Sequence, residues 1–464
     1  MKPQFRELFL GKKELTIQAD IVFRDGVRTG WISLSKGKGL ITGVGELDER
    51  SDRIGSDRIG PNGSGSTVSG RPVADVVLED GLLFPGFVDL HVHAREDATQ
   101  QWAYKETYIS AAKAALAGGV TAFADMPNTP EPVVEDEGYT KKHRLTRYSG
   151  MDVLPYAGIG PGTRPLKQKA PYKLFMAKSI GDLCFSGEKE LKETLEHYRG
   201  QQVSFHCEDP EILAASSGEE YHQDRRPAEA EIIAVEKAIE LIREFELRGT
   251  LCHISTRGAI ELVRNARRKD GMNIAMEAAP HHLLLEDNGD GITFPDCLPI
   301  TDDPEHSQPL IPDGWFQVNP PIREPMDRRA MLEAFSGGEF DFLATDHAPH
   351  TIKEKQEGMS GIPHLDSYGH WAGCLLESGV KPQILALAAS YRPGEFMAGF
   401  GYPGRELEAG GQACFTGLTR KMEQVSRDLS FSKAGWNPME GRTVPWSIEF
   451  TVLKGRGWKR VIGE

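Results

Sequence analysis

The chain has 464 residues, 39% of them hydrophobic and 26% charged, and a formal net charge of −14. This balance supports a globular core and argues against global disorder, and the length predicts roughly two to three domain-sized units. The negative charge argues against a general nucleic-acid or anionic-membrane surface, because such partners are usually met with clustered lysine and arginine. We therefore expect no nucleic-acid and no membrane partner, and an acidic substrate would need a local positive site.

No segment reaches the roughly 20 consecutive apolar residues that a membrane span needs, and the N-terminus lacks the apolar core of a signal peptide. We expect a soluble, cytoplasmic protein. The cysteines, at positions 184, 207, 252, 297, 374 and 414, show no CxxC spacing. The pattern predicts reduced, mostly buried thiols rather than a disulfide framework or a thiolate zinc site.

The first part of the chain predicts small antiparallel strands. Between Leu15 and Leu47, short apolar runs such as LTIQADIVF and GWISL alternate with glycine and charged residues. A Gly/Ser-rich stretch follows and contains the direct repeat SDRIG at 51–55 and 56–60. This composition predicts a mobile surface loop at about 50–72.

From Val76 onward, buried strand-like runs alternate with helix-like segments. The runs are VVLEDGLLFPGFVDLHVH, GVTAFADM, DVLPYAGIG, YKLFMA, QVSFHCE, GTLCHIS, MNIAMEAAP and FDFLATDHA. The segment AEAEIIAVEKAIELIREF has apolar residues at helical spacing. Such alternation is typical of a parallel sheet with crossover helices, and eight strands between residues 83 and 346 favour a (β/α)8 TIM barrel.

Beyond about Gly401 the helical pattern stops and short strand-like pieces such as WSIEFTVLKG return. We expect the N- and C-terminal strands to pair into one small composite β domain beside the barrel. The predicted division is therefore 1–80 for the first part of the β domain, 81–400 for the metal-dependent barrel and 401–464 for the second part of the β domain.

Histidines and a carboxylate stand at the ends of several predicted strands. His91 and His93 follow the run LLFPGFVDL, and alternate residues at a strand end point the same way, so both could reach one ion. An isolated HxH is weak evidence, since two surface histidines in a loop give the same pattern. The recurrence at His206, His253 and Asp346 favours convergence at the catalytic face of a barrel.

Lys173 occupies the corresponding place on another strand. Taken alone, such a lysine is ordinarily a solvated cation or an ion-pair partner. Among four histidines and two metal cations a charged ammonium would be electrostatically misplaced, whereas a carbamate formed with carbon dioxide would be an anionic bridging ligand. The surroundings favour the carbamate.

Many segments match a known family in order along the chain. The longest is PGFVDLHVHAREDATQQWAYKETYISAAKAALAGGVTAFADMPNTPEP, and the others are YKLFM, FHCEDPEIL, RRPAEAEIIAV, CHISTRGAIEL, APHHLLL, VNPPIRE, ATDHAPHT and SKAGWNPMEGRTV. Together they resemble the amidohydrolase superfamily, and specifically its dihydroorotase branch, from about Leu82 to Val444.

The resemblance implies a site with two zinc ions. His91 and His93 would hold one ion, and His206 and His253 the other. Carboxylated Lys173 and a hydroxide would bridge the ions, while Asp346 would bind the first ion and carry the proton.

The resemblance also implies a substrate-binding set. Arg95, Asn128 in MPNTP and His350 in DHAPH look like the residues that grip the substrate carboxylate in dihydroorotases, and arginine offers a planar fork for it. Singly, Arg95 could instead pair with Glu96 in a loop, and Asn128 could be a turn residue. Asn319 and Arg323 in NPPIR are further candidates for substrate contact, and His281 and His282 are expected to support the site.

Three features depart from the family pattern. Asp97-Ala98 stands where Pro-Gly is usual after the Arg-Glu pair, and GIPHLDSYGHW at 361–371 carries Pro-His in place of the commoner Pro-Gly. The segment from Glu286 to Phe316 is interpreted as an insertion near the site. These changes concern the fit of the substrate and leave the predicted metal ligands untouched.

The implied activity is the reversible closure of N-carbamoyl-L-aspartate to dihydroorotate, a step of pyrimidine synthesis, by a homo-oligomer acting on a small molecule. An allantoinase or a dihydropyrimidinase (hydantoinase) is the alternative enzyme. A catalytically dead scaffold homologue is a third possibility, but such proteins typically lose metal ligands and this sequence retains all of them.

Overall fold

The structure is a computed structural model that describes residues 3–8, 11–47, 72–178, 183–295, 298–302 and 311–462. The predicted mobile loop at about 50–72, apart from its last residue, lies outside these residues, as does Cys297. No helix within the described ranges has the length and apolar character needed to cross a membrane.

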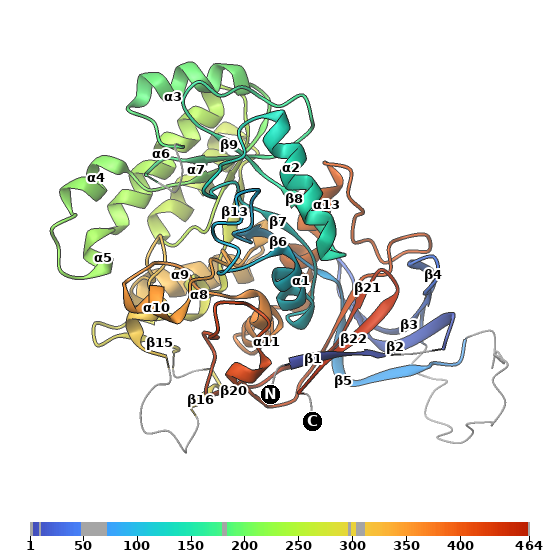
Figure 1. Ribbon diagram of the computed structural model, residues 1–464. Coiled ribbons are helices and arrows are strands. Elements are labelled where there is room, and N and C mark those ends of the chain that lie inside the picture. The colour runs from blue at the N-terminus through green and yellow to red at the C-terminus, as the bar shows by residue number, and fades with distance from the viewer. Residues whose placement is uncertain are drawn as a thin grey trace.

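Parallel strands form a central barrel beside a separate β-sheet (Figure 1). The barrel strands are β6 Phe87–Val92, β7 Val120–Asp125, β8 Asp152–Pro155 with β9 Ala157–Ile159, β10 Tyr172–Phe175, β11 Gln202–His206, β12 Arg248–Leu251, β13 Ala275–Ala278 and β17 Phe342–Leu343. Neighbouring strands pair in parallel. Only Tyr156 separates β8 from β9, so the two pieces occupy one strand position and the barrel has eight.

The barrel closes between its first and last strands. Val92 and His347 form a parallel bridge, and the backbone amide of His93 donates to the carbonyl of His347 at 2.8 Å. The amide of Thr345 also donates to a carboxylate oxygen of Asp89 at 3.0 Å. These bonds join the two edges of the sheet, which confirms the predicted (β/α)8 fold.

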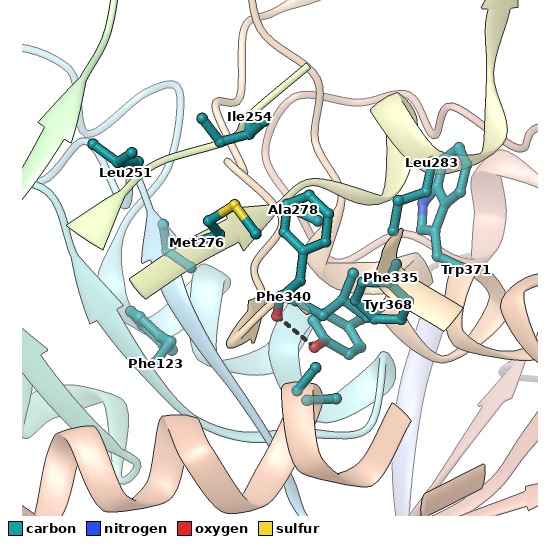
Figure 2. Packing of buried hydrophobic residues seen from close by; sticks show 14 of the residues in the cluster. Phe123, Leu251, Ile254, Met276, Ala278, Leu283, Phe335, Phe340, Tyr368 and Trp371 are labelled. Atoms are coloured by element: carbon teal, nitrogen blue, oxygen red, sulfur yellow. Dashed lines mark hydrogen bonds between the residues drawn. The ribbon is translucent and has the colours of Figure 1, made fainter. Parts of the chain in front are cut away.

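Helices follow most of the strands and cover the barrel. Their bounds are α1 Tyr108–Ala117, α2 Asp136–Thr146, α3 Glu188–Leu195, α4 Pro210–Ala215, α5 His222–Arg225, α6 Ala228–Glu244, α7 Arg257–Asp270, α8 Pro280–Leu284, α9 Pro325–Ser336, α10 Ile352–Gln356, α11 Tyr368–Glu377, α12 Pro382–Ala386 and α13 Arg392–Ala398. In α6, alanine and branched aliphatic residues at helical spacing are buried. Figure 2 shows part of the resulting core, which includes Leu251 and Met276 of the strands and Phe335 and Trp371 of the helices.

The second sheet combines both ends of the chain, as predicted. Its order is β1-β22-β21-β18-β5-β2-β3-β4. The bounds are β1 Pro3–Leu8, β2 Glu14–Val22, β3 Val27–Ser35, β4 Leu40–Glu46, β5 Val76–Pro85, β18 Phe415–Thr419, β21 Ser447–Leu453 and β22 Arg456–Ile462. Since β5 pairs with β18 as far as Pro85, the sheet continues past residue 80. The division of the chain at 80 and 400 stays a prediction.

The predicted insertion is partly described. It contains a short hairpin, β14 Glu286–Asp287 with β15 Ile292–Thr293, and β16 Thr301–Asp302. β16 pairs with β20 Arg442–Val444, which in turn pairs with β19 Glu423–Gln424. Residues 296–297 and 303–310 lie outside the described part of the chain.

Candidate active site

Most of the predicted site residues line a cavity of about 480 Å³ at the carboxyl ends of the barrel strands, whereas Lys173 and Arg323 are absent from its described lining. The cavity is lined by His91, His93, Arg95, Asn128, Phe175, Lys178, His206, Arg226, His253, Asn319, Asp346, Ala348, His350, Gly358, Met359, Ser360 and Gly361. Most of them follow strands that lie far apart in sequence. The parallel barrel brings them together because all its strands end on the same face.

The nitrogens of two histidines converge on one carboxylate. Nε2 of His91 lies 3.3 Å and Nε2 of His93 lies 3.0 Å from Oδ1 of Asp346. All three residues face the cavity, and both histidines are buried. Asp346 has a φ of 51°, a conformation that is uncommon for a residue with a side chain and often found at functional sites.

The other ring nitrogens of these histidines have different partners. Nδ1 of His91 faces Oε1 of Glu277 at 2.7 Å, whereas Nδ1 of His93 donates to the amide oxygen of Asn128 at 2.8 Å. Burial and Lys173 oppose a charge on His91, but Glu277 and Asp346 favour it and raise its pKa to about 10. Burial lowers the pKa of His93 to about 4 despite Asp346. Both contacts leave Nε2 of each histidine directed at Asp346.

His206 and His253 form the second pair. Nδ1 of His206 lies 3.1 Å from Nε2 of His253, and Nε2 of His206 lies 2.9 Å from Oε2 of Glu208. Burial holds the pKa of both histidines below the ordinary value. Nδ1 of His253 is buried and has no hydrogen-bond partner. Two neutral imidazoles with closely spaced nitrogens suit a metal ion better than they suit each other.

Lys173 is fully buried on β10, and its Nζ contacts Sγ of Cys252 at 2.9 Å. Cys252 also belongs to a buried group with His91 and Glu277 whose ligand atoms lie within 4.8 Å of one another. No role in the site was predicted for Cys252, because a lone cysteine without CxxC spacing carries no signal. The tertiary structure brings its Sγ into contact with Nζ of the predicted bridging lysine.

These residues fit divalent metal ions. His91, His93 and Asp346 offer ligand atoms within 4.8 Å of one another. Nδ1 of His253 has no partner and is a further nitrogen donor. The adjacent nitrogens of His206 and His253, 3.1 Å apart, are also available to a metal ion. Imidazole and carboxylate donors are the set that zinc and similar ions prefer. The assignment of individual ligands stays a prediction.

Arg95 gives the cavity lining a positive charge and contacts His350 there. Nη2 of Arg95 donates to Nε2 of His350 at 3.3 Å, and Nε of Arg95 is buried without a partner. Burial lowers the pKa of Arg95 to about 10, so the guanidinium is charged at neutral pH. Among the described residues it forms no ion pair with a carboxylate. A buried cation of this kind is suited to receive an anion.

Of the two further candidates for substrate contact, only Asn319 lines the cavity. Its buried Oδ1 has no partner. Arg323 is absent from the described cavity lining, since its guanidinium contacts Oγ of Ser255 at 3.1 Å and the carbonyl of Arg226 at 2.6 Å. Its substrate contact therefore stays a prediction without geometric support.

His281 and His282 are buried and absent from the described cavity lining. Nδ1 of His281 is 3.0 Å from Nε2 of His364, and Nε2 of His282 donates to the carbonyl of Pro320 at 3.0 Å. His364 is the residue that replaces the commoner glycine in the 361–371 segment, and its backbone amide donates to Nδ1 of His347 at 2.9 Å. This departure therefore places a buried imidazole against His281.

The first departure from the family pattern also has a physical role. Oδ1 of Asp97 accepts from the amide of Thr99 at 2.9 Å, and Oδ2 accepts from the amide of Glu131 at 3.0 Å. Asp97 thereby joins the loop after β6 to the loop after β7. These loops carry Arg95 and Asn128.

Several site residues were not predicted from the sequence. They include Glu277, Glu208, Arg226, Lys178 and the loop from Gly358 to Gly361. Glu277 had a usable signal, because a carboxylate inside the apolar strand AMEAA needs a buried partner. In the loop, Gly361 has a φ of +134°, and a Cβ there would lie 2.5 Å from the carbonyl oxygen of Ala348.

Comparison with known sequences yields one family and a consistent group of relatives. Residues 82–145 match the amidohydrolase family. A dihydroorotase of Thermococcus kodakarensis is 31% identical over 391 residues, covering 82% of this chain and 84% of the relative. A dihydroorotase of Bacillus licheniformis is 30% identical over 412 residues, with coverages of 82% and 88%.

Solved structures with a similar fold include two hydantoinases. An L-hydantoinase (dihydropyrimidinase) from Arthrobacter aurescens superposes with a TM-score of 0.77 at 20% identity, over 98% of this chain and 97% of that one. A D-hydantoinase (dihydropyrimidinase) from a Thermus species gives 0.74 at 19%, with coverages of 96% and 94%. At these identities the likeness concerns the fold alone, a barrel with an attached β domain.

Proposed function

The chain belongs to the dihydroorotase family of amidohydrolases, and from this premise we propose that it interconverts dihydroorotate and N-carbamoyl-L-aspartate in pyrimidine synthesis. The reaction is the reversible hydrolysis of a cyclic amide. Water adds its hydroxyl to the ring carbonyl carbon and its proton to the ring nitrogen, and the carbon–nitrogen bond between them breaks.

The observation that carries this proposal is Arg95. Its buried, charged guanidinium lines the same cavity as His91, His93 and Asp346 and has no carboxylate partner among the described residues. A substrate carboxylate would compensate this charge with two parallel hydrogen bonds. Dihydroorotate has such a carboxylate, whereas hydantoin and dihydrouracil are uncharged rings.

We propose that His91, His93, Lys173 as its carbamate, His206, His253 and Asp346 hold two divalent ions, with zinc as the expected metal. When bound, such ions make water nucleophilic near neutral pH and polarise the amide carbonyl. Glu277 and Asn128 keep the Nδ1 hydrogens of His91 and His93, so each ring presents Nε2 to the site.

Asp346 is the proposed proton carrier. Burial alone would raise its pKa, but the adjacent His91 and His93 lower it well below the ordinary value, so the carboxylate is ionised at neutral pH. Its Oδ1 can accept the proton of the attacking water and then deliver it to the departing ring nitrogen. Arg95, Asn128 and His350 are the proposed carboxylate-binding residues, and Asn319 also lines the cavity.

Substrate comparison tests this function. The purified protein, reconstituted with zinc and bicarbonate, should hydrolyse dihydroorotate with a far higher kcat/KM than dihydrouracil, hydantoin or allantoin. A preference for an uncharged ring would instead establish the hydantoinase or allantoinase alternative. Absence of turnover on all four substrates in metal-loaded protein would support the scaffold homologue.

The cellular location and the oligomeric state of the enzyme are also proposals. We place the enzyme in the cytoplasm, where pyrimidine precursors are made, and we expect a homo-oligomer. Sedimentation of the purified protein tests the second statement, and a single species of 51.2 kDa would contradict it.

A further inference from the structure

His350, one of the proposed carboxylate-binding residues, lies between two cations. Nη2 of Arg95 lies 3.3 Å from its Nε2, and Nζ of Lys105 lies 3.5 Å from its Nδ1. Lys105 stands in the turn before α1, and Arg95 follows β6. Both cations are donors only, so each can use an acceptor nitrogen of the ring, and Lys105 also has Glu354 as a partner.

The ring can satisfy only one of the two cations at a time. Burial, reinforced by the charges of Arg95 and Lys105, lowers the pKa of His350, so the imidazole is neutral. A neutral imidazole has one acceptor nitrogen and one N–H donor. If Nδ1 accepts from Lys105, Nε2 must carry the hydrogen and can no longer accept from Arg95.

Lys105 is held in place independently of the substrate. Its Nζ pairs with Oε1 of Glu354 at 2.7 Å and lies 4.7 Å above the ring of Trp102. Glu354 in turn accepts from the hydroxyl of Tyr104 at 2.8 Å and from the amide of Thr351 at 2.9 Å. The ammonium is therefore fixed near Nδ1 of His350.

A bound carboxylate resolves the competition around the ring. In the structure, Nη2 of Arg95 uses Nε2 of His350 as its acceptor. A substrate carboxylate beside Arg95 can replace His350 as the acceptor for the guanidinium, and its second oxygen can accept from a ring N–H. The hydrogen must then be on Nε2, which requires Nδ1 to be the acceptor.

We propose that Lys105 is a positioning residue that donates to Nδ1 of His350 and thereby makes His350 present Nε2–H to the substrate carboxylate. This role rests on the proposed function and deepens it, since it gives the anionic substrate a third donor and a second nearby positive charge. A substrate without a carboxylate, such as hydantoin or dihydrouracil, gains nothing from this arrangement.

Steady-state kinetics of Lys105→Met on the metal-loaded enzyme test the role. We expect KM for dihydroorotate to rise at least ~10-fold, with kcat changed less than about threefold, because a ground-state donor and a nearby charge are lost. Lys105→Arg should recover much of the affinity, since a guanidinium can donate to the same nitrogen. Lys353→Met on α10, whose side chain is 84% exposed, is the matched control and should leave both constants unchanged.

A double variant addresses folding. Lys105→Met leaves Glu354 without its cation, so Lys105→Met/Glu354→Gln removes both charges of the pair. It should show the same KM increase while keeping the metal content of the wild type. An unchanged KM in both variants, or a fall in kcat alone, overturns the proposal.

Nitrogen NMR of the histidines separates this proposal from the function itself. With orotate, an unreactive cyclic carboxylate, His350 should show the Nε2–H tautomer in the wild type and should lose this preference in Lys105→Met. A wild-type complex with the Nδ1–H tautomer overturns the positioning role even if dihydroorotate is a good substrate. Failure to turn over dihydroorotate, with the tautomer change intact, overturns only the proposed reaction.

Discussion

His93 donates its Nδ1 hydrogen to the side-chain oxygen of Asn128 across 2.8 Å. The two residues follow adjacent barrel strands, β6 and β7, and both line the cavity. The bond fixes the ring so that Nε2 faces Asp346. Asn128 therefore orients a predicted metal ligand, in addition to its proposed contact with the substrate carboxylate.

Replacement of Asn128 by alanine should weaken metal binding, because His93 loses the partner that fixes its tautomer. Loss of such an outer hydrogen bond typically reduces metal affinity by about 10–100-fold. Competition with a zinc-selective chelator measures the change. Asn288→Ala, at an exposed position in the β14–β15 hairpin, is the control. Equal zinc affinity in Asn128→Ala and wild type would limit Asn128 to substrate binding.

Lys173→Ala should abolish activity, since neither alanine nor a cation can replace a bridging anion between two metals. A short carboxylic acid supplied in solution should restore part of the activity. Carbon NMR after growth with labelled bicarbonate should show a carbamate signal in the wild type that is missing from the variant. Full activity of Lys173→Ala would remove the carbamate from the mechanism.

The purified protein should contain about two divalent ions per chain, given the four histidines and Asp346 that line one cavity and the buried Lys173 proposed as a bridging carbamate. Elemental analysis after reconstitution with zinc and bicarbonate measures the content. Removal of the ions with a chelator should abolish turnover, and zinc should restore it. Only trace metal after reconstitution would contradict the proposed centre.

Arg95→Met should reduce kcat/KM for dihydroorotate by roughly two to three decades, which corresponds to about 2–4 kcal/mol for a lost bidentate, charge-assisted contact. Metal content should stay unchanged because Arg95 is not a ligand. Any activity on dihydrouracil or hydantoin should fall little. Arg268→Met at an exposed position of α7 is the control. Normal turnover of dihydroorotate by Arg95→Met would point to the hydantoinase or allantoinase alternative.

Lys142→Met should lower the free energy of unfolding by roughly 3–5 kcal/mol, because it leaves the carboxylate of Asp125 buried without its cation. The melting temperature should fall accordingly. Nζ of Lys142 lies 2.8 Å from Oδ2 of Asp125, and both side chains are almost fully buried. Asp125 also accepts from the amide of Ala94 at 2.8 Å, next to His93. Thermal unfolding of Lys141→Met, its exposed neighbour paired with Glu137, provides the comparison. Equal melting temperatures would show that the pair is not a structural requirement.

The sequence alone predicted the barrel, the composite β domain and the strand-end positions that carry the chemistry. These features follow from local patterns, because apolar runs of strand length alternate with helical periodicity and residues at strand ends share one face. His91 and His93 could be paired in this way because two residues along a strand point in the same direction. Arg95 and Asn128 could be placed near them because adjacent parallel strands end side by side.

Only the tertiary structure decided which side chains surround those positions. Cys252 meets Lys173 across 79 residues, and Lys105 meets His350 across 245. It also turned Arg323 toward Ser255 and away from the described cavity lining. Such contacts depend on how strands and loops distant in sequence pack around the barrel, and no local periodicity records that packing.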